Sequence, residues 1–170
     1  QVLVIDAGGS AAGEFDPGAS IVAPFLHSRR INRVHYVLVS YPRVDHYGGM
    51  KSIVERFKPS EFWSGPSAGN TSRYADLEEA VDRLKVSRAV LGTHLGCRSI
   101  GEVRLCVLHP PEAGSAKKRS GRGESVVVRL TFGEHHFLFT GDIAGARRQI
   151  TSLGLFPEES IHLENAISNL

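Results

Sequence analysis

The sequence predicts a mixed α/β fold in a single domain. Short apolar runs typical of buried strands alternate with segments in which apolar residues recur at helical spacing, and glycine and proline separate these segments. The chain has 170 residues, of which 41% are hydrophobic, so it can bury one substantial core. We therefore expect residues 1–170 to form one domain.

The first half of the chain carries both kinds of pattern. Residues 2–5 form a continuous apolar run, and apolar side chains in residues 50–57 recur at i, i+3, i+4 and i+7. The predicted elements, in order, are a strand at 2–5, a helix at 20–27, a strand at 34–40, a helix at 50–57, a strand at 61–63 and a helix at 74–84.

The second half is richer in strand patterns. Gly133-Glu134 separates two strong apolar runs and predicts a tight hairpin. The predicted elements are strands at 89–91, 96–98 and 103–108, a polar loop at 110–123, strands at 125–132 and 135–140, and a helix at 144–153. Residues 158–170 fit neither pattern clearly.

Composition excludes few classes of function. The net charge of +2 is weak support for any particular partner. The sequence has no apolar run of about 18 residues and no signal peptide, and because it opens directly in a strand we expect an excised domain. Cys97 and Cys106 lack metal-type spacing, so we expect two buried small residues in preference to a disulfide or a zinc site.

Three aspartates follow predicted strands and are candidates for chemistry. Asp45-His46 lies between a strand and a helix, where a carboxylate beside an imidazole suits a divalent metal, although a helix cap by Asp45 is the simpler alternative. Asp142 follows the last strand beside a glycine and is placed either to bridge metals or to cap a helix. Asp6 is expected to support a ligand or the fold without binding metal itself.

A basic loop precedes the strand that leads to Asp142. Its Lys117, Lys118 and Arg122 predict contacts with a phosphate backbone, and a solvated surface loop is an equally good interpretation. A second basic cluster contains Arg29, Arg30 and Arg33. The adjacent His135 and His136 are expected to point to opposite faces of a strand, so they do not suit a shared metal.

Taken in order, these segments resemble the soluble metallo-β-lactamase-like domain of the ComEC/Rec2 family of competence proteins. The resemblance runs over nearly the whole chain and is most specific at residues 40–49, SYPRVDHYGG, which are similar to the family's metal loop. The other matching segments are VLVIDAGG (2–9), FDPG (15–18), IVAPFL (21–26), GEVRLCVLHPP (101–111) and SVVVRLTFGEHHFLFTGDI (125–143).

The resemblance implies a fold and a setting. It implies a four-layer αβ/βα sandwich, here incomplete at both ends, with metals at the sheet ends. The parent protein would be a bacterial inner-membrane channel that imports single-stranded DNA, with this part as a soluble domain proposed to degrade the strand left outside. The implied partners are single-stranded DNA and the transmembrane portion of the parent. The implied cofactor is one divalent metal, Zn or Mn, on Asp45, His46 and Asp142, or none.

The chain departs from the family's ligand set at several positions. The first metal-binding histidine falls on Tyr41 and the next ligand on Arg43, whose guanidinium cannot give up its proton to bind a metal. The late His-His-Gly-Ser stretch falls near residues 163–168, where this chain has LENAIS and Asn165 stands in its place.

Three hypotheses remain. The chain is a one-metal phosphodiesterase in which Arg43 pairs with a phosphate oxygen; or a degenerate domain that binds DNA or stabilises the channel; or a stand-alone hydrolase of another substrate on the same fold. The loss of ligands favours the second.

Overall fold

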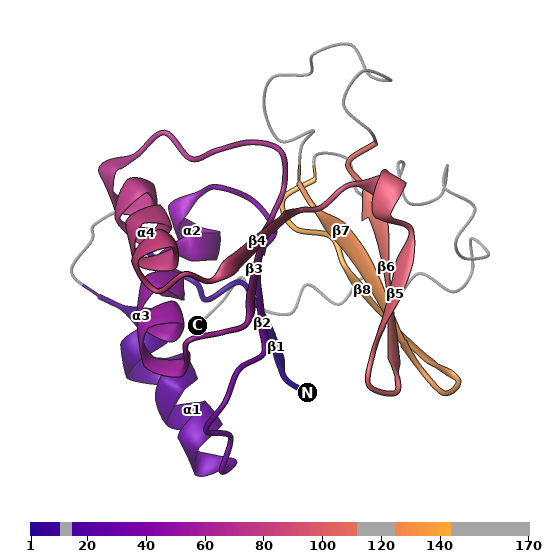
Figure 1. Cartoon of the computed structure of the whole chain (residues 1–170), viewed down its shortest axis with the longest axis horizontal. Coiled ribbons are helices and arrows are strands. Elements are labelled where there is room, and N and C mark those ends of the chain that lie inside the picture. Colours follow the sequence, from indigo (N-terminus) through magenta and orange to yellow (C-terminus); the bar gives the residue numbers. More distant parts are fainter. Residues whose placement is uncertain (11–14, 112–124, 144–170) are drawn as a thin grey trace.

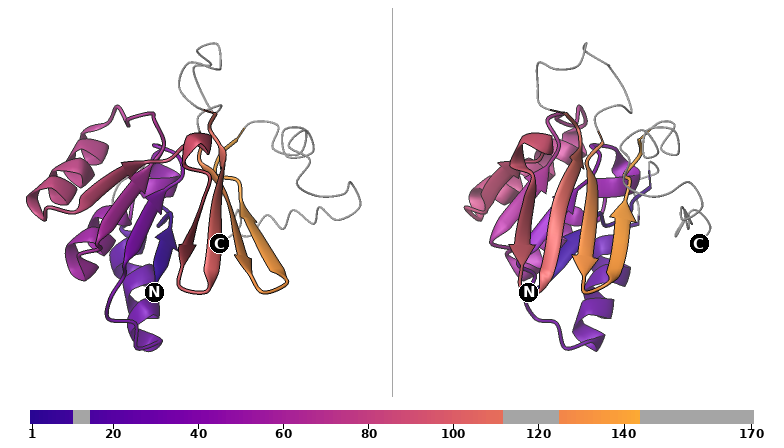
Figure 2. Two further views of the ribbon diagram at one scale, coloured as in Figure 1. Left: turned by 45° about the vertical axis from the view of Figure 1, so that its right-hand side comes forward. Right: turned by 90° about the vertical axis from the view of Figure 1, so that its right-hand side faces the viewer.

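The computed structural model describes residues 1–10, 15–111 and 125–143, and it contains two β-sheets that face each other (Figures 1 and 2). The α-helices lie on the outer face of the first sheet, away from the second (Figure 1). The prediction of a mixed α/β fold is therefore confirmed. The described residues supply three layers, and the fourth layer of an αβ/βα sandwich is not among them.

The first sheet is parallel, with strand order β1-β2-β3-β4. Its strands are β1 (Leu3–Ile5), β2 (Tyr36–Val39), β3 (Glu61–Ser64) and β4 (Ser87–Val90). The helices between them are the π-helical turn η1 (Gly18–Val22), α1 (Ala23–Ser28), α2 (Val44–Tyr47), α3 (Met50–Phe57) and α4 (Ser72–Arg83). The helix expected at 20–27 corresponds to η1 and α1 together, and those expected at 50–57 and 74–84 correspond to α3 and α4. The sequence did not predict α2, which is a single turn inside the motif at residues 40–49.

The second sheet is antiparallel, with strand order β5-β6-β7-β8. The 3-10 turn η2 (Thr93–Leu95) leads into β5 (Cys97–Ile100), β6 (Val103–His109), β7 (Val127–Phe132) and β8 (His135–Phe139). Phe132 pairs with His135 across the tight turn, so the predicted hairpin is confirmed. The expected helix at 144–153 and the segment 158–170 lie outside the described residues.

Strand alternation divides the core into two clusters. Val37 and Val39 of β2 pack with the helices, whereas Leu38 points to the opposite face and packs against the second sheet. Trp63 of β3 joins Leu38 in the layer between the sheets and is fully buried. The two sheets are therefore held together by a continuous apolar layer. No helix within the described ranges is long and apolar enough to cross a bilayer.

Four glycines, Gly9, Gly18, Gly48 and Gly49, let the segments that follow β1 and β2 pack backbone against backbone. A Cβ on Gly18 would lie 1.8 Å from the Gly49 carbonyl oxygen, and a Cβ on Gly48 would lie 2.7 Å from the Cα of Gly9. These contacts hold the motif at residues 40–49 against η1 and against the turn that follows β1.

Replacing Gly18 with alanine should therefore lower the free energy of unfolding by about 2–3 kcal/mol, because backbone atoms cannot move aside as a flexible side chain can. Gly101→Ala is the control. It adds strain at a φ of 60° but has no atom within 4 Å of the new Cβ, so about 1 kcal/mol is expected. Urea unfolding followed by circular dichroism measures both, and equal losses would contradict close packing at Gly18.

The two cysteines form a disulfide, so the prediction of two separate buried residues is wrong. Ile100 pairs with Val103 across the β5–β6 turn, and this register places Cys97 opposite Cys106 with Cα atoms 4.0 Å apart. The bond lies at the edge of the second sheet. The prediction failed because it considered only the spacing of the two cysteines in the sequence, whereas their pairing depends on the register of the β5–β6 hairpin.

Removing this disulfide should cost about 2.5 kcal/mol of stability, the chain-entropy estimate for a loop of about ten residues. The measurement is urea unfolding with and without dithiothreitol. The double variant Cys97→Ser/Cys106→Ser should start at the lower stability and show no response to the reductant. Two titratable thiols in protein unfolded without reductant would show that the bond does not form.

Candidate functional site

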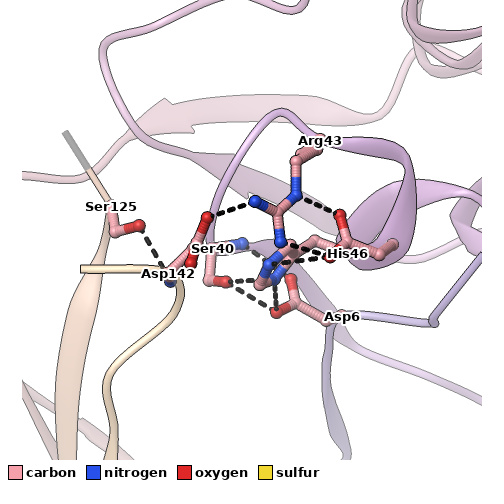
Figure 3. Close-up of polar contacts among 7 residues, drawn as sticks. Asp6, Ser40, Arg43, His46, Ser125 and Asp142 are labelled. Atoms are coloured by element: carbon pink, nitrogen blue, oxygen red, sulfur yellow. Dashed lines mark hydrogen bonds and ion pairs between the residues drawn. The ribbon is translucent and has the colours of Figure 1, made fainter. Parts of the chain in front are cut away.

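Polar residues that lie next to strand ends of both sheets come close together (Figure 3). Asp6 directly follows β1, and Ser40 directly follows β2. Ser125 precedes β7 and Asp142 follows β8, so the second sheet contributes to the same place. Loops at strand ends are where a rigid scaffold presents reactive side chains.

Asp6 organises the inner part of this site. Its carboxylate accepts hydrogen bonds from the Ser40 N–H (2.8 Å) and the Ser40 hydroxyl (2.6 Å), and it lies 2.8 Å from Nδ1 of His46. This contact engages one ring nitrogen of His46 and leaves Nε2 directed toward Asp45, 4.0 Å from its Oδ2. A carboxylate on the far nitrogen of a histidine is the usual support of a metal-binding imidazole. The geometry thus agrees with a supporting role for Asp6.

Arg43 lies between the two other carboxylates. Its Nε donates to Oδ1 of Asp45 at 2.5 Å, and a second, parallel contact joins Nη2 to Oδ2 of the same residue. Its Nη1 is 2.7 Å from Oδ2 of Asp142 (Figure 3). The hydrogen bond from Arg43 lowers the pKa of Asp45, and the same bond holds the pKa of Arg43 above its usual range. One guanidinium therefore neutralises part of the charge of two aspartates.

The ion pair with Asp142 joins the two sheets. Gly141 has a φ of 55°, and a Cβ there would lie 3.1 Å from the Ser40 hydroxyl, so this turn rests against the loop after β2. The Asp142 N–H donates to the Ser125 hydroxyl (2.9 Å), and the Val126 N–H donates to the Ser40 carbonyl (2.8 Å). Backbone and side-chain contacts thus bring Asp142 to Arg43.

His46 is largely buried, and its proton is held more tightly than usual. Burial lowers the pKa of His46, but the hydrogen bond to Asp6 and the charges of Asp6 and Asp45 outweigh burial and raise it overall. Metal binding requires the neutral ring, so a metal ion would have to compete with a proton for this imidazole.

A divalent metal does not fit the donor set in this arrangement. Both candidate carboxylates are engaged by Arg43, and the ring of Tyr41 packs edge-on against His46 with centroids 6.0 Å apart, where the resemblance places a ligand. Across residues 1–10, 15–111 and 125–143, no group of three or more His, Cys, Asp or Glu side chains is arranged to hold a metal ion.

The structure brings together most of the residues that the sequence singled out, namely Asp6, Tyr41, Arg43, Asp45, His46 and Asp142. The positions Lys117, Lys118, Arg122 and Asn165 lie outside the described residues. Helix capping does not explain Asp45, because Arg43 is the N-cap of α2 and no side chain caps that turn.

Sequence reasoning missed Ser40 and Ser125. The sequence placed Ser40 in the motif at residues 40–49 without predicting a role for it. In the structure Ser40 is 2% exposed, and its side chain contacts both Asp6 and His46. A buried polar residue at the end of an apolar strand was the available signal. Ser125, which is fully buried, had no comparable signal.

Comparison with known proteins adds little. No family model matches the sequence, and no curated protein matches it. Among solved structures, the chain is similar to CmlA, a diiron beta-hydroxylase from Streptomyces venezuelae, with a TM-score of 0.45 and 18% identity. The match covers 71% of this chain but only 23% of that protein. A likeness at this level carries no argument about chemistry.

Proposed function

We propose that this chain is a metallo-β-lactamase-like domain of a ComEC-family DNA-uptake protein, and that it binds single-stranded DNA without metal-dependent hydrolysis. The proposed loss of hydrolysis rests on a single observation, which is that Asp45 and Asp142 both bind the guanidinium of Arg43. The family assignment rests on the order of the matching sequence segments. Two facing sheets with helices outside the first agree with it.

The absence of hydrolysis follows from what an arginine can and cannot do. Hydrolases of this kind need a cation that binds a water molecule and lowers its pKa to make a nucleophile. Arg43 supplies a positive charge, but its N–H groups only donate hydrogen bonds and cannot coordinate water as a metal does. With Asp45 and Asp142 both bound to Arg43, the guanidinium supplies the positive charge that a metal would supply. It cannot activate a water molecule, so the nucleophile is missing.

The DNA part of the proposal rests on basic segments away from the carboxylates. Arg43 already donates two hydrogen bonds to Asp45 and forms an ion pair with Asp142, so this residue has little left for a phosphate. The exposed Arg29, Arg30 and Arg33 form one cluster in the first half of the chain, and Lys117, Lys118 and Arg122 form another. Positive charge without fixed geometry suits contact with a nucleic-acid backbone.

Fluorescence anisotropy with a labelled single-stranded oligonucleotide tests the binding. Affinity should fall about tenfold between about 50 and about 200 mM salt, as expected for release of a few counterions. The variant Lys117→Glu/Lys118→Glu/Arg122→Glu should bind much more weakly than Lys51→Glu/Arg56→Glu/Arg104→Glu, which makes the same change in charge at scattered exposed positions. Absence of binding, or affinity that does not change with salt, would remove the DNA function.

A nuclease assay with Mn2+ on the same oligonucleotide tests the loss of hydrolysis. No Mn2+-dependent cleavage above background is expected. Cleavage that disappears in Asp142→Ala would contradict it.

A second candidate, a one-metal hydrolase, is favoured by the contact between Asp6 and His46. That contact is the support a metal-binding imidazole needs, and it leaves Nε2 directed toward Asp45. Asp45, His46 and Asp142 would then hold one Zn or Mn ion, which would supply an activated water, and Arg43 would have to leave both carboxylates. One equivalent of metal in protein purified without chelator, lost in Asp45→Ala, would establish this candidate.

A further inference from the structure

We infer that the outer face of η1 and α1 docks on the surface of an anionic lipid bilayer. This face, called the α1 surface below, consists of exposed residues on the two helices and on the turn after them, namely Ile21, Phe25, Arg29, Arg30 and Arg33. It lies at the end of the helical layer opposite to α2 (Figure 1). The inference goes beyond the proposed function and does not depend on DNA binding or on the ion pairs of Arg43.

The helix formed by η1 and α1 is apolar on two sides. The Ala23 N–H donates to the Gly18 carbonyl, so the two elements run on as one helix. Ala23 and Leu26 are buried and pack in the core beneath the first sheet's helices. Ile21 and Phe25 point outward one turn apart, and they are 57% and 54% exposed. A helix that is apolar all round is normally covered on every side, so the outer side of this one needs an apolar partner.

Arginines continue the apolar stripe at the end of α1. The guanidinium of Arg29 lies 5.5 Å from the ring centre of Phe25, so positive charge begins where the apolar residues end. The Arg30 N–H donates to the His27 carbonyl at 2.8 Å, which turns the chain back at the end of the helix. Apolar and basic side chains therefore share one face of the molecule.

The positive charge of the α1 surface has no counterion within the described part of the chain. Residues 17–44 contain no aspartate or glutamate. Arginines elsewhere in the described ranges pair with carboxylates, namely Arg43, Arg83, Arg88 and Arg98. The arginines of the α1 surface form no ion pair with a carboxylate in those ranges. A basic surface without counterions of its own is complementary to an anionic one.

The apolar side chains favour a bilayer over single-stranded DNA as the partner of this surface. Phosphates would explain the arginines in both cases. A DNA base stacks on an aromatic ring, but an aliphatic side chain such as Ile21 offers no face for stacking. The boundary between lipid headgroups and acyl chains accepts both Ile21 and Phe25, while arginines at the same depth contact lipid phosphates. The basic segment that contains Lys117, Lys118 and Arg122 then remains for DNA.

Sedimentation with lipid vesicles tests the inference on the purified chain. One set of vesicles contains equal parts of phosphatidylglycerol and phosphatidylcholine, and the other contains phosphatidylcholine alone. We expect binding to the anionic vesicles that weakens as salt is added, because salt screens the attraction between exposed charges. No binding to the neutral vesicles is expected.

Two pairs of substitutions separate the charge from the apolar contact. Arg29→Gln/Arg33→Gln should lower the partition coefficient about thirtyfold. Its control, Lys85→Gln/Arg104→Gln, removes the same charge at exposed positions on other elements and should change it less than about threefold. Ile21→Ser/Phe25→Ser should lower it at least about tenfold, whereas Val90→Ser/Leu95→Ser, at other exposed apolar positions, should leave it unchanged.

Phe25→Trp gives a second measurement that does not require a weakened variant. Trp63 is fully buried, so a blue shift of tryptophan emission that appears in Phe25→Trp and not in the parent comes from position 25. Anionic vesicles should cause this shift, since an indole favours the interface between water and lipid. If a double variant is unfolded by circular dichroism, this shift decides the question, and its absence overturns the inference.

The inference is also overturned if the parent protein does not bind anionic vesicles, or if either α1-surface variant binds them as well as its control. Titration of a labelled single-stranded oligonucleotide identifies the competing partner. Ile21→Ser/Phe25→Ser should leave DNA affinity unchanged. A loss of DNA affinity in this variant, with vesicle binding intact, would assign the α1 surface to DNA instead of lipid.

Discussion

Replacing Asp6 with alanine is expected to lower the free energy of unfolding by about 4 kcal/mol, because a buried donor loses its partner and the backbone becomes strained. The Ser40 N–H donates to Asp6 at 2.8 Å, and Ser40 is 2% exposed, so water cannot easily replace the lost acceptor. Asp6 also has a φ of 55°, a conformation that alanine adopts at a cost of about 1 kcal/mol. Urea unfolding monitored by circular dichroism measures the loss.

The matched control is Asp6→Asn. Asparagine tolerates positive φ and keeps one oxygen for the Ser40 N–H, but the amide nitrogen in place of Oδ2 cannot accept from the Ser40 hydroxyl or from His46. A loss of about 1–2 kcal/mol is expected, clearly less than for alanine. If the two variants lose equal stability, the hydrogen bond from Ser40 is not what makes Asp6 important.

Replacing Trp63 with alanine is the second large effect, with an expected loss of about 4 kcal/mol. The side chain is fully buried between the sheets, and its ring stacks on Tyr36 with centroids 4.8 Å apart. The guanidinium of Arg98 lies 4.9 Å from the Trp63 ring centre, and the indole N–H donates to Glu61 at 2.8 Å. Truncation leaves a cavity and removes all three contacts.

Trp63→Phe separates packing from polar contacts. Phenylalanine keeps an aromatic ring against Tyr36 but cannot donate to Glu61, so about 1.5 kcal/mol is expected. Because Trp63 is the single tryptophan, both variants lose tryptophan fluorescence, so circular dichroism is the probe used for all three proteins. A loss below about 1 kcal/mol for Trp63→Ala would mean that the layer between the sheets is not tightly packed there.

The fold could be predicted well where local patterns determine it. The apolar spacing in residues 50–57 predicted α3 with its observed bounds, Met50–Phe57, because one face of that helix is buried. The hairpin of β7 and β8 followed from Gly133-Glu134 between two apolar runs. The bond between Cys97 and Cys106 could not be read in this way, since it depends on which residues face each other across a turn.

The site was predictable in its members but not in their contacts. Asp6, Asp45 and Asp142 were singled out because each follows a strand, and strand ends meet at the edges of sheets. Arg43 was recognised as a lost ligand position. Arg43 binds one aspartate in α2, after the first sheet's β2, and one that follows β8 of the second sheet. This depends on the turn at Gly141, and no local pattern predicts that this turn lies against Ser40.

The ion pair of Arg43 has a consequence for the conditions under which the two sheets stay joined. A bound ion occupies its site only when its free concentration exceeds its dissociation constant, and a chelator strips it away. The guanidinium belongs to the chain itself, so its contacts with Asp45 and Asp142 do not depend on a supply of free ions. The domain thus keeps this cross-link in metal-starved surroundings, where a domain clamped by zinc would loosen.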